Sequence, residues 1–476
     1  MRITKIEIKN FRAFCGAYQI DLHKAGKNLL IYGENGSGKT SLYQALKNFL
    51  ESSDGEHQFK PHQNIFNSDA GYIKLHLRTD AQSKQDTYEW SETVKDETND
   101  QLLINASRTK GFLDYKDLLE THYLHRENDV VNVLDLLVKT LLANTVSRET
   151  DRSLAEDWDS IQPPFPRRGA TTQITALERQ IENFNNELAG RLEILQVKTS
   201  EILRKFGYNI ALDLNFHGLT YNKDNKTLDN QEILLKVKFF DRDIPEHHRF
   251  LNEAKLSAIA IAIYFSSILI QPESDLRILA LDDVLIGLDM SNRLPVLDIL
   301  EEYFEDYQIF LTTYDKAWYE IVKQRTSHGG KWKAVEFYFR QTDEYEIPVY
   351  AENKAYLDKA REYLEANDDK ACAIYLRTAY EMIIEEFCES KQLPVKYRRD
   401  PNKQYTQDFW DAIKIENKKR IEHKNPALLA QKLIDDIELY RSRILNPLSH
   451  ATITTIPKKE IEDTIEAVEN LGTALG

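Results

Sequence analysis

The sequence predicts an α/β protein with a mixed sheet, a helical insertion and a separate all-α C-terminal domain. Apolar and polar residues alternate in the first 22 residues and again between Tyr72 and Trp90, as is typical of strands. A short apolar run from Leu29 to Tyr32 ends in glycine-rich sequence and is followed by apolar residues at helical spacing, which indicates a buried parallel strand and then a helix. The last 125 residues or so carry only helical periodicity.

The middle of the chain has helical texture. From Phe112 to about Ala143 the apolar pattern is helical, and the prolines of Gln162–Gly169 interrupt it. From about Thr172 to Lys205, apolar residues recur at steps of three and four, which predicts the second helix of an antiparallel arm about 50 Å long at about 1.5 Å per residue. We therefore expect four segments: residues 1–110, the first lobe of an α/β head; 111–207, the helical arm; 208–350, the second lobe; and 351–476, a helix bundle.

Composition narrows the class of partner. The formal net charge of -15 argues against broad, non-specific binding to nucleic acid, although it does not exclude a local basic groove. The three cysteines lack metal-ligand spacing and suit a reducing compartment. The N-terminus has no apolar leader, and the longest apolar stretch, Ala258 to Ile270, is shorter than the roughly 20 residues that span a bilayer. We expect a cytoplasmic protein with no membrane partner.

The segment GENGSGKT, Gly33 to Thr40, matches the phosphate-binding pattern G-x-x-x-x-G-K-[ST], and it lies between a strand and a helix as that pattern requires. Lys39 is expected to place its charge at the β- and γ-phosphates, and the Thr40 hydroxyl to ligate Mg²⁺. The expected nucleotide-binding residues of this loop are Gly33, Asn35, Gly36, Ser37, Gly38, Lys39, Thr40 and Ser41. The predicted ligands are ATP and Mg²⁺.

A second motif, ILALDD from Ile278 to Asp283, reads as a hydrophobic strand that ends in two carboxylates. Asp282 is expected to hold Mg²⁺ through water. Asp283 is expected to be the catalytic base that polarises the attacking water.

The motifs and their order resemble those of the ABC-type ATPases of the SMC, Rad50 and RecF class. The resemblance rests on NFR at Asn10 to Arg12, the phosphate loop, the helical arm and the acidic strand, and it covers about residues 1–110 and 200–345. It implies an ABC-ATPase head, with Arg12 among the nucleotide-binding residues. It also implies a homodimer or higher oligomer, because such heads hold ATP between two copies.

The resemblance assigns further residues to the composite site. The segment LNEAK is similar to the ABC signature, with Asn252 at the serine position, and Asp289 in GLD is similar to the D-loop that crosses the dimer interface. The segment Ile309 to Glu320 resembles the strand and polar switch of ABC ATPases. Tyr314 stands at the switch position, where a histidine is usual, and is assigned a catalytic role. Asp283 stands where glutamate is usual, which implies slower hydrolysis. No Q-loop glutamine is evident in Gly111 to Leu119.

The C-terminal domain carries two polar patterns. Arg377 and Glu381 are four residues apart and so share a helix face, and six residues separate Arg443 from His450. These patterns resemble HEPN ribonucleases and the PrrC and RloC anticodon nucleases, which join an ABC ATPase to a nuclease domain. The alternative is an ordinary ion pair in a bundle that binds a partner protein.

The short arm, the LDD strand end, the TTYD switch and the helical C-terminal domain together resemble ATPases of prokaryotic antiphage defence, most of all the AriA family of PARIS systems, with the PtuA family of Septu as another relative. This implies a homo-oligomeric sensor and scaffold that restrains a TOPRIM nuclease partner until a phage protein triggers its release. Two alternatives stay open: an ATPase-gated ribonuclease, and a RecF-like DNA repair ATPase.

Overall fold

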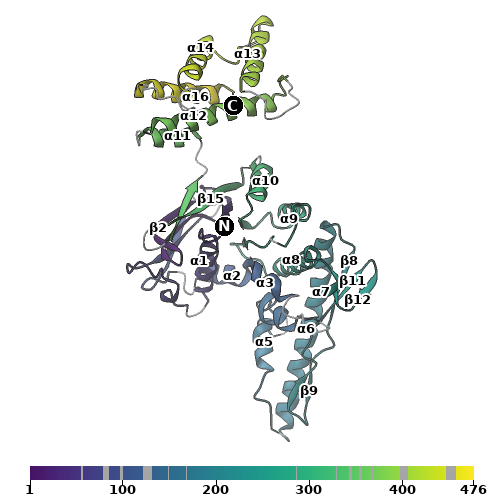
Figure 1. The fold of residues 1–476 in the computed structure, drawn as a ribbon. Coiled ribbons are helices and arrows are strands. Elements are labelled where there is room, and N and C mark those ends of the chain that lie inside the picture. The colour runs from purple at the N-terminus through teal and green to yellow at the C-terminus, as the bar shows by residue number, and fades with distance from the viewer. Residues whose placement is uncertain are drawn as a thin grey trace. The chain divides into compact units, whose positions relative to one another are not determined.

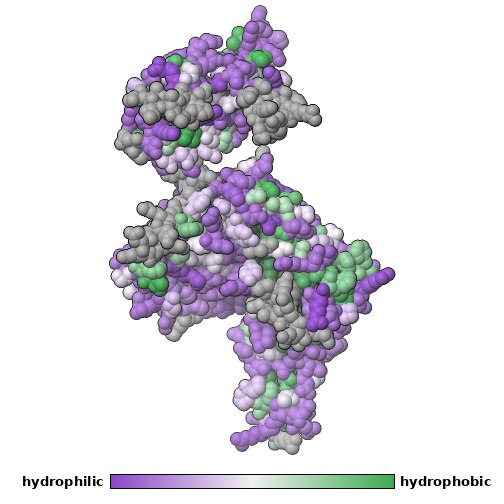
Figure 2. Space-filling view, in the orientation of Figure 1, coloured by the Kyte–Doolittle hydropathy of each residue, from purple (hydrophilic) through white to green (hydrophobic). Residues whose placement is uncertain are grey.

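The computed structural model describes residues 1–54, 57–78, 85–96, 100–121, 131–147, 150–167, 169–285, 287–327, 330–341, 346–352, 356–365, 368–396, 406–445 and 457–475. The chain forms two compact units, Met1–Ala351 and Glu352–Gly476, each described by itself. Figure 2 shows that the visible faces of both units are mostly hydrophilic, with small apolar patches.

The first unit begins with an antiparallel sheet. Its order is β2 (Phe14–Asp21), β1 (Arg2–Phe11), β4 (Tyr72–Arg78) and β5 (Gln85–Ser91). Ile8 of β1 pairs with Tyr18 on one side and with Ile73 on the other. The segment from Tyr72 to Trp90 therefore extends the first sheet, as the alternation predicted.

A second sheet of six strands forms the centre of this unit (Figure 1). Its order is β16 (Glu346–Glu352), β15 (Trp332–Gln341), β3 (Asn28–Gly33), β14 (Gln308–Thr313), β13 (Ile278–Asp282) and β6 (Gly111–Asp114). The pairs from β15 to β6 are all parallel. Leu29 and Ile31 of β3 pack in the core shared with the first sheet and α1 (Lys39–Glu51), whereas Leu30 belongs to a second core with α8 (Glu253–Leu269). The mixed α/β fold is confirmed.

The buried side chain of Gln308 fastens the two sheets together. Its Nε2 donates to the carbonyl oxygens of Ile3 (2.8 Å) and Lys27 (3.0 Å), and its Oε1 accepts from the Ile3 N–H (2.7 Å). Because Ile3 lies in β1 and Gln308 begins β14, this side chain fixes the first sheet against the start of the central strands.

The arm is built around one long helix, α6 (Thr171–Lys205), which buries Leu177, Ile181, Phe184 and Leu188 at the predicted spacing. Besides α8 and β8 (Ile210–Asn215), its neighbours include the short helix α5 (Leu154–Ser160) and β9 (Thr220–Asn222), which forms a hairpin with β10 (Thr227–Asp229) (Figure 1). The amide of Asn185 exchanges two hydrogen bonds with the backbone of Leu219, which precedes this hairpin. The expected antiparallel pair of helices is therefore wrong.

The helical pattern predicted from Phe112 to Ala143 is confirmed only in part, because its described residues include two strands as well as helical turns. Gly111–Asp114 forms β6, whose pairing with the distant β13 overrides the local helical pattern. The remaining described elements of that stretch are α3 (Tyr115–Glu120), β7 (Val131–Asn132), α4 (Leu134–Leu136) and the π-helical turn η3 (Leu137–Leu141).

The other elements of the first unit surround this frame. They include α2 (Gln101–Thr109), η1 (Lys60–His62), α7 (His247–Phe250), α9 (Met290–Tyr303) and α10 (Lys316–Thr326). A small antiparallel sheet contains β7, β8 (Ile210–Asn215), β11 (Leu234–Phe239) and β12 (Arg242–Ile244). Three of these strands come after the long helix of the arm.

The second unit is helical: α11 (Tyr356–Glu365), α12 (Asp369–Ser390), α13 (Thr406–Glu422), α14 (Gln431–Tyr440), the π-helical turn η6 (Arg441–Leu445) and α16 (Lys458–Leu475). Its core holds Leu376, Tyr380 and Trp410. The helical character predicted for this region is present in its described residues. Within the described ranges of both units, no helix has the length and apolar character needed to cross a membrane.

Candidate nucleotide-binding site

The phosphate loop joins the end of β3 to the start of α1. Gly36 and Gly38 have φ values of 86° and 97°, a left-handed conformation that glycine adopts without strain. A Cβ on Gly38 would lie 2.9 Å from Pro348 Cγ, and one on Gly33 would lie 2.3 Å from Ser37 Oγ. The Ser37 hydroxyl is buried and has no hydrogen-bond partner among the residues that the structure describes. A buried polar atom inside a glycine-lined loop suits an anionic ligand that accepts hydrogen bonds.

Lys39 begins α1 and turns its ammonium group back into the loop. Its Nζ donates to the carbonyl oxygens of Gly33 (2.6 Å) and Glu34 (3.2 Å), and it lies 3.5 Å from Asp283 Oδ2. The side chain is 4% exposed, so its charge is compensated by these groups rather than by solvent.

The acidic strand end meets the phosphate loop at Asp282. Its Oδ2 accepts a hydrogen bond from Thr40 Oγ1 and its Oδ1 accepts one from Thr312 Oγ1, both at 2.7 Å. Burial raises the pKa of Asp282, while the two threonine hydroxyls act to lower it. Thr40 and Asp282 are 242 residues apart in the chain, and the parallel pairing of β3, β14 and β13 brings them together.

Asp283 follows the strand in a left-handed conformation, with a φ of 53°. Aspartate tolerates this region better than most residues do. Its Oδ1 accepts from the Tyr314 N–H (3.1 Å), and its own N–H donates to Thr312 Oγ1 (3.2 Å). Burial raises the pKa of Asp283 and the charge of Lys39 opposes that rise. A raised pKa makes the carboxylate a stronger base.

The residues present fit a magnesium ion shared with a nucleotide. Thr40 offers a hydroxyl and Asp282 a carboxylate, and Mg²⁺ commonly binds to one or two carboxylates together with substrate phosphates. The described part of the chain has no cluster of three or more His, Cys, Asp or Glu side chains with metal-binding geometry.

Other predicted residues border the loop without contacting its lysine. The turn at Arg12 rests on the start of α1, because the Ala13 N–H lies 3.4 Å from Ser41 Oγ. The Asn64 amide donates to the Arg12 carbonyl (2.6 Å) and holds this turn in place. Asn35 is exposed at the loop tip.

Tyr314 approaches the site through its backbone. Its N–H contacts Asp283, whereas its side chain is 42% exposed. The catalytic role assigned to Tyr314 therefore stays a prediction, and the contact that the structure gives is one that any residue at this position would make.

Asn252 and Asp289 both cap helices. Asn252 Oδ1 accepts from the Lys255 N–H (3.1 Å) at the start of α8, and Asp289 Oδ1 accepts from the Asn292 N–H (3.1 Å) at the start of α9. Among the described residues, neither side chain has a recorded contact with the phosphate loop of its own chain. Their assignment to a nucleotide stays a prediction that needs a second copy.

Sequence analysis missed one acidic residue at this site. Asp114 ends β6 and pairs in register with Asp282, and after burial its negative charge is a further cause that raises the pKa of Asp282. Asp114 Oδ1 accepts from the N–H groups of Lys116 (2.8 Å) and Asp117 (3.1 Å). The signal was the short apolar segment GFLD, which ends in a carboxylate like the main acidic strand.

The C-terminal residues form two separate groups. Glu381 Oε1 contacts Arg377 Nε and Thr406 Oγ1, each at 2.9 Å. Arg443 instead pairs with Glu460 (3.1 Å), and His450 lies outside the described residues. Within the described part, no recorded contact joins Arg443 to the Arg377–Glu381 pair.

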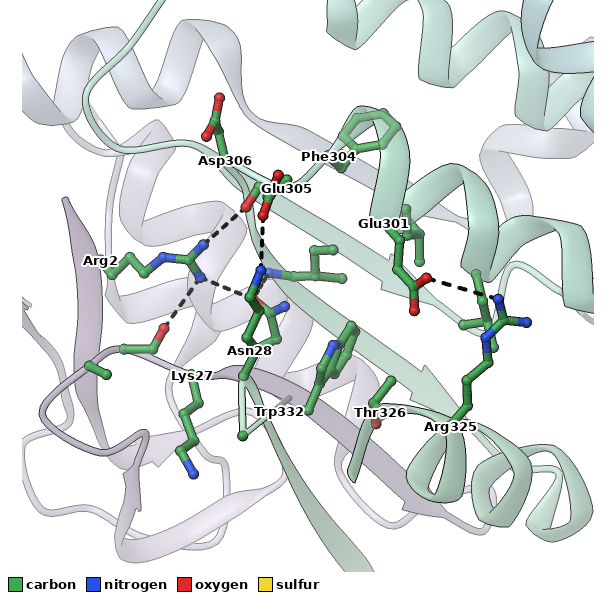
Figure 3. Close-up of a pocket in the computed structure, with 17 residues that line it drawn as sticks. Arg2, Lys27, Asn28, Glu301, Phe304, Glu305, Asp306, Arg325, Thr326 and Trp332 are labelled. Atoms are coloured by element: carbon green, nitrogen blue, oxygen red, sulfur yellow. Dashed lines mark hydrogen bonds and ion pairs between the residues drawn. The ribbon is translucent and has the colours of Figure 1, made fainter. Parts of the chain in front are cut away.

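A pocket of about 800 Å³ opens away from the phosphate loop, at the edge of the central sheet where β3, β14 and β15 begin (Figure 3). Arg2 on its wall donates to Asn28 Oδ1 (3.1 Å), Arg325 lies 3.9 Å from Glu301, and Lys331 lies 2.9 Å from Glu305. These cations already have partners, and none of the predicted site residues lines the pocket.

The comparisons with known proteins give one family match and several similar solved structures. The family model described as the RecF/RecN/SMC N terminal domain matches residues 2–328. No curated protein matches the chain. Among solved structures, the chain is similar to the SmcHead bound to the C-winged helix domain of ScpA, at 13% identity over 74% of this chain and 98% of that one, with a TM-score of 0.41.

Two further solved structures are similar. An Smc head domain with an extended coiled coil, bound to the C-terminal domain of ScpA and derived from Pyrococcus furiosus, has 13% identity over 77% of this chain and 99% of that one, with a TM-score of 0.41. The SMC head domain from Thermotoga maritima has 12% identity over 74% and 100%, with a TM-score of 0.36.

Proposed function

Because the chain belongs to the RecF/RecN/SMC family of ATP-hydrolysing head domains, we propose that its first unit binds and hydrolyses ATP. The observation that carries this proposal is the 2.7 Å hydrogen bond between Thr40 of the phosphate loop and Asp282 of the acidic strand. This bond joins two motifs that are distant in sequence: a loop suited to bind phosphate and a strand end that offers carboxylates for a metal ion and a base.

The roles follow from the contacts. The loop backbone and Lys39 bind the phosphates, and Asp283 accepts a proton from the water that attacks the γ-phosphate. Mg²⁺ held by Thr40 and Asp282 would neutralise phosphate charge. Lys39 lies beside Asp283 at 3.5 Å, so the cation that binds phosphate also favours the charged form of the base.

The proposal extends to an assembly of at least two copies. Asn252 and Asp289 open helices whose N-termini favour anions, and neither has a recorded contact with its own phosphate loop. In heads of the class that the sequence resembles, these positions face the nucleotide of the other copy. Equilibrium sedimentation with and without ATP tests this point, and a monomer under both conditions would contradict it.

We further propose that this ATPase is a sensor and scaffold in antiphage defence. Its support is the resemblance of the motif set and domain order to defence ATPases, together with a second compact unit that has its own core. ATP would stabilise an assembled state that restrains a TOPRIM-type nuclease, and a phage protein would shift the equilibrium toward release.

The test is a phage challenge of bacteria that carry the chain with its neighbouring genes. Lys39→Ala should abolish protection and should abolish ATP binding by the purified protein, because it removes the cation inside the loop. Lys60→Ala, at a side chain of the first unit that is 76% exposed, is the matched control and should protect like the wild type. Protection that survives Lys39→Ala would refute the role of ATP.

A further inference from the structure

Arg293, in the first turns of α9, joins two segments that border the site. Its Nε lies 3.0 Å from the carbonyl oxygen of Leu285 and 2.7 Å from that of Leu288, in the turn that precedes α9. Its Nη1 lies 2.5 Å from Asp315 Oδ2. One largely buried guanidinium therefore holds the turn of Leu285, Gly287 and Leu288, here called the D-loop turn, against the residue that follows Tyr314.

Asp315 connects this contact to the base. Burial would raise the pKa of Asp315, but the bond with Arg293 and the backbone N–H of Trp318 hold it below the ordinary value, so the carboxylate stays charged and paired. The preceding residue, Tyr314, donates its N–H to Asp283. Asp283 and Arg293 also line one small cavity of about 10 Å³, which has space for no more than about one water molecule.

The other end of the connection reaches the helix that Asn252 caps. A Cβ on Gly287 would lie 2.4 Å from Ser257 Oγ of α8, so the D-loop turn packs with its backbone directly on that helix. A shift of α8 must therefore move the turn, because the Gly287 backbone packs directly against Ser257 of that helix.

We propose that Arg293 is a positioning residue that couples α8 and the D-loop turn to the alignment of Asp283. The connection runs from α8 through the D-loop turn to Arg293, from Arg293 to Asp315, and through the Tyr314 N–H to the base. It rests on the proposed ATPase function and deepens it, because hydrolysis becomes sensitive to what contacts the start of α8.

Arginine is required at this position by its geometry. A planar guanidinium presents several donors in fixed directions: here the Nε–H is shared between the carbonyl oxygens of Leu285 and Leu288, and Nη1 donates to the carboxylate of Asp315. A lysine ammonium keeps the charge but cannot reproduce that arrangement. Arg293→Lys therefore keeps the positive charge and removes the geometry, so it tests whether the coupling depends on the guanidinium contacts.

The experiment uses the purified full chain and measures ATP binding at equilibrium, steady-state hydrolysis over a range of pH, and the melting temperature. The variants are Arg293→Lys, Asp315→Asn and the double substitution. Arg325→Ala is the matched control, because Arg325 pairs with Asp298 and also ties α10 to α9, but away from Asp283. The control should hydrolyse ATP like the wild type.

We expect kcat to fall by about tenfold to a hundredfold in each single variant, since a misplaced base loses its alignment, while ATP affinity and KM stay within about threefold. The double variant should be no slower than the worse single variant, because both break one connection.

Three results would overturn the coupling: unchanged kcat in Arg293→Lys, losses that multiply in the double variant, or losses of binding and melting temperature that parallel the loss of kcat. A wild-type chain that binds no ATP would instead overturn the proposed function itself. If the wild type hydrolyses ATP and Arg293→Lys is equally active, the coupling is overturned and the proposed function stands.

Discussion

Thr312 offers a direct test of how the acidic strand holds its metal. Its hydroxyl donates to Asp282 Oδ1 (2.7 Å) and accepts from the Asp283 N–H (3.2 Å), and the residue is 5% exposed. Thr312→Val keeps the shape of the side chain and removes both bonds. Thr312→Ser keeps the hydroxyl and removes only a methyl group, so it serves as the matched control.

The size of the effect follows from the carboxylate. A hydrogen bond to a charged group contributes about 1.5–3 kcal/mol, and about 1.4 kcal/mol corresponds to a factor of ten, so losing the Thr312 bond should disfavour the charged form of Asp282 by about tenfold to a hundredfold and raise its pKa. Burial already raises that pKa, so the increase starts above the ordinary value of an aspartate. An acid with a raised pKa stays protonated to a higher pH, and protons then compete with Mg²⁺ for the same oxygens.

The assay is the Mg²⁺ dependence of ATP hydrolysis at a series of pH values. As the pH falls, the Mg²⁺ concentration needed for half-maximal hydrolysis should begin to rise at a pH about one to two units higher in Thr312→Val than in the wild type. At higher pH the variant should need the same Mg²⁺ concentration as the wild type. Thr312→Ser should follow the wild type. A valine variant whose Mg²⁺ dependence matches the wild type at every pH would refute the role of Thr312 and the assignment of Asp282 as the metal-binding carboxylate.

Three further predictions concern the base, the sheets and the C-terminal unit. Asp283→Asn should lower kcat at least about a hundredfold with ATP binding retained, because an amide cannot accept the proton, and an unchanged kcat in steady-state assays would remove Asp283 as the base. Gln308→Leu should lower the free energy of unfolding of the first unit by about 3 kcal/mol, because it leaves the backbone N–H and C=O of Ile3 buried and unpaired; an unchanged denaturation midpoint would contradict this. His450→Ala should leave phage protection intact if the C-terminal unit is a scaffold, whereas intact RNA and lost protection in the variant, beside fragmented RNA in the wild type, would favour the ribonuclease alternative.

The contiguous motifs were the predictable part of the site. The phosphate loop is specified by local sequence, since Gly36 and Gly38 must adopt left-handed conformations and Lys39 must begin the helix. The strand that ends in Asp282 was equally evident, because it is an uninterrupted apolar run that ends in carboxylates.

The parts that sequence reasoning missed depend on long-range contacts. β6 has four residues, and its pairing with β13 joins segments far apart in the chain, so the local helical pattern around Phe112 was misleading. Asp114 and Arg293 were overlooked for the same reason. Nothing in the neighbouring sequence indicates that Arg293 reaches the D-loop turn and Asp315 together.

The separation of Thr40 from Asp282 has a consequence for biosynthesis. At about 5–20 residues added per second, the 242 residues between them take about 12–50 s to translate. During that interval the phosphate loop has left the ribosome's active centre, but its acidic partner strand does not yet exist. A ligand stabilises a fold only when its site is complete, so ATP offers no protection to the nascent first half, and that half depends on its own antiparallel sheet or on chaperones until Asp282 and Thr312 have been made.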